Sequence, residues 1–504
     1  MNHRLVVQSV ADNLASFSLL WPEVLIAITL VGVLVLAILP PQYQRYWLFP
    51  VAFLGTLMAW YSKYQLINHP ALGPTRPLFN HLLVLDALAI FFCLLLISIT
   101  LLMLLLHAHC SPPASDNIQG PVYVVLLLGI LLSSCFLVMA SHWITIYLGL
   151  TLLSLTSALL IGSHKTPRNV EASLKYLLYS MATTALMLWG VAYFYGFTGT
   201  LTLGYAGLQL SGQAFPEYLI LASILLCLSH LLWLSAAVPY HFCILDIYQG
   251  TPPAIVAYLS TIPKLTTVAV LLRIAQQFLP QLTQTLQEHA QHGMAVLALL
   301  TITVGNAAAL QQKNVQRLMA YGSIAQGGFL LAGVAASPSS PIGVLYYSTV
   351  YGIMGFAIWV GIKMLQDLTG STYLKDCVGL GRKFPLLGCG ITLVVLALIG
   401  LPPTAGFTGK LLLFVVLWGH MQSTGSFVFL ALFVASLLGT VLSLYYYLKL
   451  PYTLFCKTAQ IPTTLPNRHQ HDIMILCCLA ILLLAGFFVS NNLLTILNSW
   501  LECV

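Results

Sequence analysis

The sequence predicts an all-α protein that crosses a membrane many times. Of its 504 residues, 59% are hydrophobic and only 6% are charged, whereas a soluble domain carries about 25% charged residues. Apolar stretches of about 20 residues recur along the chain, and each can cross a ~30 Å hydrocarbon core as a helix. These stretches do not alternate with polar residues as barrel strands do, which leaves the helical class.

We expect about 14 transmembrane helices, including a retained first one, because Met1–Leu14 has no signal-peptide pattern. The remainder leaves no room for a soluble domain. The expected spans are 16–39, 47–67, 79–106, 121–139, 142–162, 172–196, 217–241, 254–278, 293–311, 319–336, 342–366, 386–420, 426–449 and 472–496.

The polar residues exclude several function classes. The net charge of +7 is dispersed between apolar runs, without the basic domain or tail that nucleic-acid binding needs. The 11 cysteines are scattered through apolar segments and show no CxxC spacing, so we interpret them as packing residues. No phosphate-binding loop and no dinucleotide fingerprint is present.

Basic residues are concentrated in alternate loops, which predicts orientation. By the positive-inside rule, both termini then lie on the outer face. The basic loops contain Arg45, Lys165, Arg168, Lys313, Arg317, Lys375, Arg382, Lys383, Lys449, Lys457 and Arg468, and the opposite loops contain little beyond Lys63 and Arg76.

Four basic residues fall inside apolar spans: Lys175, Lys264, Arg273 and Lys410. Each costs about 2.5–3.5 kcal/mol at a helix centre. Lys175 and Arg273 lie near span ends and can snorkel, whereas Lys264 and Lys410 lie near the middle. Burial disfavours the charged form of a lysine, so these two are either proton-relay residues or structural lysines held by carbonyl groups or water.

Prolines interrupt two of the spans. Pro239 lies in VPYHFCILDIYQGTPP, and Pro402 and Pro403 lie in IGLPPTAGFTGKLLLF. Proline frees a backbone carbonyl and kinks a helix, and irregular backbone within a membrane is tolerated where it is buried or lines water. The two breaks lie about five spans apart, near Lys264 and Lys410. We therefore favour two structural repeats, each with an ion path at its break, over the alternative of ordinary proline kinks.

Two further groups of charges have open interpretations. Glu171 and Lys175 are four residues apart on one helix face. They form either a plain ion pair at the membrane boundary or an access element for protons. Asp86 is either a helix-end charge or a contact with a neighbouring subunit.

Six ordered motifs carry a family resemblance. They are YLGLTLLSL, VEASLKYLLYSMATTALMLWGVAYFYGFTGT, VPYHFCILDIYQGTPP, YLSTIPKLTTVAVLLR, GNAAALQQKNVQRLMAYGSIAQGGFLLAG and IGLPPTAGFTGKLLLF. Over roughly residues 120–450 the chain resembles the antiporter-like N subunits of NADH-quinone oxidoreductase, respiratory complex I. The resemblance implies 14 helices with two inverted five-helix repeats and with helices 7 and 12 broken.

The resemblance also implies a domain plan. It comprises 1–120 (helices 1–3), 121–280 (first repeat, helices 4–8), 290–450 (second repeat, helices 9–13) and 451–504 (helix 14). The implied partners are the M and L antiporter-like subunits, small subunits such as K and J, and the lipid bilayer. NAD, flavin, iron–sulfur clusters and quinone are expected in partner subunits, and no cofactor in this chain.

The family's proposed proton path uses a glutamate on helix 5 and lysines on helices 7, 8 and 12. Lys264 and Lys410 match the last two. Thr151 stands where the family has the glutamate, and Leu234 where it has the helix 7 lysine. Replacing both partners of a buried pair can be neutral, whereas losing one costs about 3–5 kcal/mol.

His230, one turn before Leu234, is either a substitute proton carrier or a packing residue. Gln326 stands where many relatives have histidine and others have glutamine, so the glutamine says little for or against proton transport. The leading hypothesis is therefore a proton-translocating subunit, without redox chemistry of its own, in a bacterial inner membrane. The alternatives are a non-pumping scaffold of the same arm, or a subunit of a cation/proton antiporter, a membrane-bound hydrogenase or a ferredoxin-linked complex.

Overall fold

The computed structural model is a bundle of long helices. It describes Asn13 and residues 16–68, 76–108, 119–205, 216–336, 341–456 and 470–502. Within these residues, 12 helices are long and apolar enough to cross a membrane, or 13 if the bent pair Leu374–Lys383 and Pro385–Ile399 is counted as one span. The prediction of an all-α, many-span membrane protein is confirmed.

The helices fall into three groups along the chain. The first group comprises α2 (Trp21–Ile38), α3 (Pro41–Gln65), α4 (Ala87–Ala108), α5 (Gln119–Met139), α6 (Trp143–Gly162), α7 (Pro167–Thr198) and α9 (Glu217–Leu234). The central group comprises α10 (Ile244–Gly250), α11 (Pro253–Leu259), α12 (Ile262–Gln277), α13 (Gln284–Ala309), α14 (Val315–Ala336) and α15 (Ile342–Thr369). The last group comprises α16 (Leu380–Lys383), α17 (Pro385–Ile399), α18 (Ala405–Thr424), α19 (Phe427–Cys456), α20 (Gln470–Phe488) and α21 (Ser490–Glu502).

Short elements connect some of these helices. The strands β1 (Arg76–Leu78) and β2 (Leu83–Leu85) pair in antiparallel register, with Arg76 opposite Leu85. Among the described residues, the short 3-10 helices are η1 (Leu66–Asn68), η2 (Leu203–Tyr205), η3 (Leu279–Gln281) and η4 (Leu374–Cys377).

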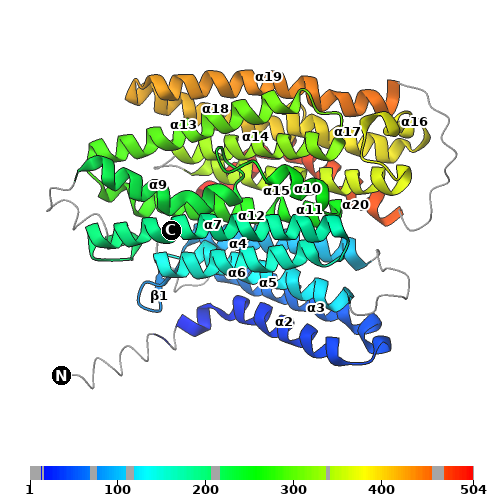
Figure 1. Ribbon diagram of the computed structural model, residues 1–504, viewed down its shortest axis with the longest axis horizontal. Helices are drawn as coiled ribbons and strands as arrows, with labels where there is room; N and C mark the ends of the chain where they lie inside the picture. Colours follow the sequence, from blue (N-terminus) through cyan, green and yellow to red (C-terminus); the bar gives the residue numbers. More distant parts are fainter. Residues whose placement is uncertain are drawn as a thin grey trace.

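The long helices lie side by side, and their ends gather at two sides of the bundle (Figure 1). Leu83, which precedes α4, bridges Ala140, which follows α5. On the other side, Asn314 before α14 bridges Tyr373 after α15. Successive spans therefore run in opposite directions. We call the side at which α2, α4 and α6 begin the first side, and the side at which α3, α5 and α7 begin the second side.

Burial varies strongly from the centre of the bundle to its edges. The apolar window of Pro253–Gln281 is 100% buried and that of Val315–Ala336 is 94% buried, against 28% for Trp21–Ile38 and for Phe427–Cys456. Figure 1 accordingly shows α2 and α19 at opposite edges. The helices that carry polar groups at the centre are therefore enclosed by protein and not by lipid.

The helix around Pro239 is interrupted. α9 ends at Leu234, and helix resumes only at Ile244. The gap is anchored from a neighbouring helix, because the backbone N–H of Val238 donates to the hydroxyl of Thr301 on α13 at 3.0 Å. Proline has no N–H to give to the preceding turn, which weakens a helix at this position.

The second interruption contains Pro402 and Pro403. α17 ends at Ile399 and α18 begins at Ala405. Gly400 ends α17 in the left-handed region, with φ at +85°, a conformation that glycine adopts without steric cost. The last carbonyl groups of α17 thereby lose their helical partners and become available to side chains.

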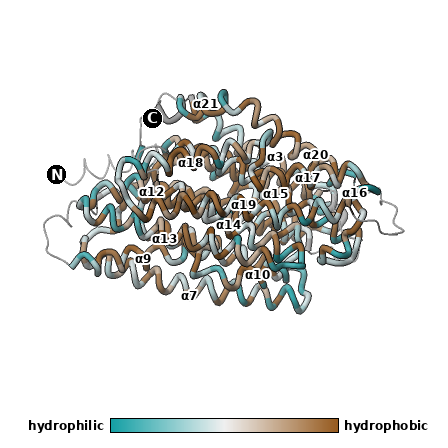
Figure 2. The backbone as a smooth tube through the Cα atoms, turned by 90° about the horizontal axis from the view of Figure 1, so that it is seen from above, coloured by the Kyte–Doolittle hydropathy of each residue, from teal (hydrophilic) through white to brown (hydrophobic). Residues whose placement is uncertain are grey.

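Three expectations about the spans need correction. The expected spans 47–67 (α3) and 386–420 (α17 and α18) are not among the 12 helices above, because the first contains polar residues and the second is broken. The expected last span 472–496 is present but shorter than expected, since α20 ends at Phe488 and a separate α21 follows. Figure 2 shows α21 along one edge of the bundle.

Candidate functional site

Lys264 lies on the most enclosed span and is 1% exposed. Its Nζ donates to the carbonyl oxygen of Ser323 at 2.6 Å and to the hydroxyl of Ser323 at 2.5 Å. It also lies 5.9 Å from the ring centroid of Tyr351. These partners are all neutral. A carboxylate partner for Lys264 is not found within the described part of the chain.

Lys410 uses the break between α17 and α18. Its Nζ donates to the carbonyl oxygens of Leu398 and Ile399, both at 2.9 Å. The ammonium group also lies 4.8 Å from the ring centroid of Phe329, within range of a cation–π interaction. Lys410 is 3% exposed. The broken helix thus provides the oxygen atoms that a lysine needs inside the membrane.

Polar groups on α14 connect the surroundings of the two lysines. Ser323, which binds Lys264, and Gln326 are three residues apart and therefore share a helix face. Gln326 Nε2 donates to the Leu398 carbonyl oxygen at 2.9 Å, the same oxygen that Lys410 uses. Lys264 and Lys410 consequently lie at the two ends of one buried polar seam, which we call the α14 seam and define by Lys264, Ser323, Gln326, Leu398 and Lys410.

Tyrosines surround the α14 seam. Tyr347 donates a hydrogen bond to Gln326 Oε1, and Tyr351 donates to the Ser260 carbonyl oxygen at 3.0 Å. Tyr446 donates to Asn306 Oδ1 at 3.1 Å. Sequence reasoning missed the tyrosines and gave Gln326 little weight. The sequence did contain one signal for these tyrosines. Tyr347 and Tyr351 are four residues apart, which puts both hydroxyls on one helix face.

His230 is fully buried, and hydroxyl groups occupy both of its ring nitrogens. Nε2 lies 2.9 Å from Ser154 Oγ on α6. Nδ1 lies 2.9 Å from Thr183 Oγ1 and 3.0 Å from Thr184 Oγ1 on α7. His230 therefore links α6, α7 and α9 inside the membrane through groups that can each donate or accept a hydrogen bond.

Thr151 and Leu234, predicted to replace the family's ion pair, have no side-chain partner on another helix among the hydrogen bonds of the described residues. Thr151 Oγ1 donates to the Leu148 carbonyl oxygen of the preceding turn at 2.9 Å. Leu234 is 5% exposed and is the last residue of α9. The structure thus has a hydroxyl bound to its own helix at Thr151 and a buried aliphatic side chain at Leu234.

Glu171 and Lys175 belong to a larger network at the second side. Lys175 Nζ lies 2.8 Å from Glu171 and 3.4 Å from Asp246, and Arg317 lies 3.2 Å from Asp246. The side chains are between 36% and 66% exposed, so the network is open to the surroundings. The expected position of Lys175 inside a span is thereby refined to the first turns of α7.

Three buried ion pairs were not expected from the sequence. Lys63, expected in a loop, lies inside α3 and contacts Glu23 at 2.5 Å, with both side chains 1% exposed or less. Arg273, expected to snorkel, is 1% exposed.

The guanidinium group of Arg273 donates to both carboxylate oxygens of Asp86, at 2.8 and 2.9 Å. Asp86 is therefore an intramolecular partner and not simply a helix-end charge. The third pair joins Lys363 on α15 to Asp472 on α20 at 2.6 Å. These pairs tie helices together near the ends of the spans, because Asp86 directly precedes α4 and Asp472 lies in the first turn of α20.

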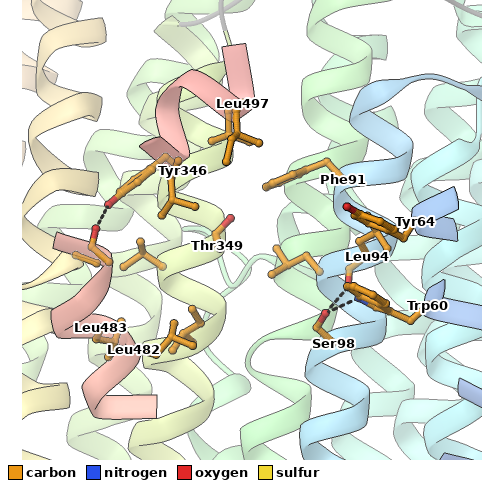
Figure 3. A pocket seen from close by; sticks show the side chains of 17 residues that line it. Trp60, Tyr64, Phe91, Leu94, Ser98, Tyr346, Thr349, Leu482, Leu483 and Leu497 are labelled. Carbon is orange, nitrogen blue, oxygen red and sulfur yellow. Dashed lines mark hydrogen bonds between the residues drawn. The ribbon is translucent and has the colours of Figure 1, made fainter. Parts of the chain in front are cut away.

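One cavity within the described residues is apolar and separate from the α14 seam. It encloses about 370 Å³ between α3 and α4 on one wall and α15, α20 and α21 on the other (Figure 3). Its polar lining groups are already satisfied. The Ser98 hydroxyl donates to Leu94 and accepts from Trp60, and the Thr349 hydroxyl donates to Leu345. This cavity offers no route for protons.

The broken helices and the buried lysines define an antiporter-like membrane subunit. A family profile described as NADH:quinone oxidoreductase/Mrp antiporter, TM, matches residues 140–439. NADH-quinone oxidoreductase subunit N of Desulfitobacterium hafniense is 32% identical over 456 residues, which cover 86% of this chain and 88% of that protein. NAD(P)H-quinone oxidoreductase subunit 2 of Synechococcus elongatus is 35% identical over 329 residues, which cover 65% of this chain and 61% of that protein.

Solved structures show the same fold. A chain of respiratory complex I from Thermus thermophilus with bound aureothin superposes with a TM-score of 0.75 at 27% identity, covering 94% of this chain and 98% of that one. A chain of the archaeal membrane-bound sulfane sulfur reductase gives 0.82 at 20% identity, covering 96% and 97%. The chain belongs to the NADH:quinone oxidoreductase/Mrp antiporter family and, within it, to the N subunits of complex I.

Proposed function

We propose that this chain moves protons across the membrane through Lys264, Lys410 and water, driven by quinone reduction elsewhere in a complex I-type enzyme. The electron donor of that enzyme is NADH, NADPH or another reductant, and the chain itself carries out no redox step. NAD, flavin, iron–sulfur clusters and quinone then reside in partner subunits. The neighbours in the membrane arm are the M and L antiporter-like subunits and small subunits such as K and J.

The observation that carries this proposal is the α14 seam. A lysine inside a membrane is costly, and each of these two is held by neutral oxygen atoms only. Neutral partners stabilise the ammonium form less than a carboxylate would, so the neutral form lies closer in free energy. A group of this kind can accept and release a proton, whereas Lys63 and Arg273 are paired with the carboxylates of Glu23 and Asp86.

The remaining parts of the path follow from this arrangement. The network around Glu171 and Lys175 gives protons access from the second side, and His230 takes the place of the missing ion pair. Under this proposal, helices 4–8 (121–280) and 9–13 (290–450) act as two inverted repeats. Residues 1–120 and 451–504 flank them.

The orientation in the membrane is part of the proposal. Lys165, Arg168, Lys313 and Arg317 all lie at the second side, next to the start of α7 or α14. By the positive-inside rule, the second side faces the cytoplasm of a bacterial cell and both termini lie outside. Of the basic residues behind this assignment, Lys457 and Arg468 lie outside the described residues.

A non-pumping scaffold is the competing function, and Thr151 and Leu234 are the observations that favour it. It requires Lys264 and Lys410 to be structural. The test is NADH-driven acidification of inverted membrane vesicles that contain complexes with Lys264→Ala or Lys410→Ala. We expect at least a roughly tenfold slower pH change, equivalent to about 1.4 kcal/mol.

The exposed residue Lys313 provides the matched control, because Lys313→Ala removes a lysine from the same chain without touching the α14 seam. NADH oxidation by a soluble acceptor reports whether each complex has assembled. Assembled Lys264→Ala and Lys410→Ala complexes that still build the full pH gradient would establish the scaffold function instead.

A further inference from the structure

A second, larger cavity opens at the second side, away from the α14 seam. It has a volume of about 850 Å³, within the roughly 300–1,000 Å³ range of ligand pockets. The end of α4, the start of α5, the connection between α6 and α7, the connection between α10 and α11, and α15 all contribute to its wall. None of Lys264, His230 and Lys410 lines it, so it is distinct from the proposed proton path.

The inner wall of this cavity contains a hydrogen-bond donor that has nothing to bind. Asn169 lines the cavity and is 5% exposed. Its Oδ1 accepts a hydrogen bond from the Thr166 hydroxyl. Its Nδ2 has no acceptor among the described residues. Leaving a buried amide N–H without an acceptor costs free energy, and an oxygen atom bound in the cavity would remove that cost.

The surroundings of Asn169 favour an anion. Thr166 caps the 32-residue helix α7, whose dipole attracts negative charge. Pro167 has no N–H, and the Asn169 and Val170 N–H groups bind Thr166, which leaves the Arg168 N–H of the first turn for a ligand. Arg168, in that first turn, also lines the cavity, with its side chain exposed and without an ion pair among those found in the described residues.

The other charged residues in the wall are Lys363 and Asp367. Lys363 lines the cavity and is paired with Asp472, so these two charges offset each other. Asp367 is the carboxylate among the described lining residues, and it is exposed. It is carried by α15, whereas Asn169 and Arg168 are carried by α7.

The opposite part of the wall is apolar. Met103 and Leu106 on α4, Tyr123 on α5 and Ile255 on α11 line it. A free inorganic anion would leave this part of the wall without a partner. A ligand that carries both an anionic oxygen group and hydrocarbon fits both parts of the wall, and the bilayer supplies such molecules at high concentration.

We propose that this cavity binds the phosphate group of an anionic phospholipid. Asn169 Nδ2, the backbone N–H of Arg168 and the Arg168 guanidinium group hold the phosphate oxygens, and the apolar residues hold the glycerol and upper acyl carbons. Basic pockets between membrane helices at the cytoplasmic side are the usual place for such headgroups. The proposal does not depend on proton movement through this chain.

The experiment uses the whole complex reconstituted in phosphatidylcholine nanodiscs that contain a photoactivatable phosphatidylglycerol. After irradiation, peptides are analysed for lipid adducts. We expect adducts on 103–106 and 163–172 in the wild type. We expect Arg168→Gln to lower their yield roughly fivefold, the effect of about one surface charge, and Asn169→Asp to lower it at least as much. Arg382→Gln, which removes an exposed basic residue outside the cavity, should leave the yield unchanged.

Two outcomes would overturn the proposal. Absence of adducts from these segments in the wild type rules out a lipid there, whatever the variants do. Loss of the adducts on adding inorganic phosphate, at constant ionic strength, would show that the site takes the free anion and not the lipid. Arg168→Gln changes an exposed side chain, so the comparison holds even where Asn169→Asp prevents assembly.

Discussion

Lys410 and Gln326 donate hydrogen bonds to the same carbonyl oxygen, that of Leu398, each at 2.9 Å. This oxygen is available because α17 ends at Ile399. The broken helix, the lysine and the glutamine on α14 therefore form one unit. If Lys410 becomes neutral, Gln326 still binds the carbonyl group, so the unit can change its charge without leaving the oxygen unpaired.

The first prediction concerns Gln326. Gln326→Leu removes the donor to Leu398 and the acceptor for Tyr347, and leaves a buried hydroxyl unpaired, at a cost of about 1–3 kcal/mol. We expect proton pumping per NADH oxidised to fall at least threefold in vesicles. Gln326→His keeps a donor and an acceptor and should retain most activity. Equal pumping by the Leu and His variants would show that the shared carbonyl is incidental.

The second prediction concerns His230. Its hydrogen bonds to Ser154, Thr183 and Thr184 let a proton enter at one ring nitrogen and leave at the other. We expect His230→Ala to lower the number of protons moved per electron pair. Ser154→Ala, which removes one of the three contacts, should lower it less. An unchanged stoichiometry in assembled His230→Ala complexes would remove this histidine from the path.

The third prediction concerns the contact between α17 and α18. A Cβ atom built on Gly406 would lie 1.9 Å from the Ala397 carbonyl oxygen, closer than any non-bonded contact allows. Gly406→Ala must therefore push α18 away, at a cost of several kcal/mol, and little assembled complex is expected by immunoblot of membranes. Gly419, on the same helix, has nothing within 4 Å. Gly419→Ala should assemble normally, and normal levels of both variants would contradict the close approach.

The fourth prediction concerns the buried pair Glu23–Lys63. Lys63→Met leaves a buried carboxylate alone and should destabilise the complex by about 3–5 kcal/mol. The double variant Glu23→Gln with Lys63→Met removes both charges and should recover most of that loss. Thermal denaturation in detergent measures the difference. Additive losses in the double variant would mean that the two residues stabilise the fold independently.

The fifth prediction concerns pH and His142, which lies between α5 and α6. Its Nδ1 accepts the backbone N–H of Ile144 at 3.2 Å and so caps α6. Burial lowers the pKa of His142 below its ordinary value of 6.5. Because the folded pKa is the lower one, the stability from the neutral form is complete above about pH 6.5 and is lost as pH falls through the folded pKa.

We therefore expect the thermal stability of the wild type to fall more than that of His142→Asn between pH 7.5 and pH 5.5. Asparagine caps a helix without titrating, and the difference should not exceed ~1 kcal/mol, the worth of a cap. The measurement is a pair of melting curves at each pH. Parallel losses in the two proteins would show that the cap does not titrate.

Much of the fold could be predicted because its signals are local. An apolar run of sufficient length predicts a span wherever it occurs, and a proline or a lysine inside such a run is visible without knowing its neighbours. The parts of the chain that were misassigned contain both apolar and polar residues, so their local sequence does not identify them clearly. Lys63 lies near the end of a less apolar helix, so it resembled a loop residue until Glu23, 40 positions away, was seen beside it.

By itself, the sequence determined that this chain spans a membrane many times and buries Lys264 and Lys410 inside it. Through the family resemblance, it also predicted that Thr151 and Leu234 replace the family's usual ion pair. Only the tertiary structure decided what those lysines touch. Ser323 lies 59 positions from Lys264, and Asp86 lies 187 positions from Arg273. Partners at such separations are chosen by how helices pack against one another, and no local pattern in the chain contains that information.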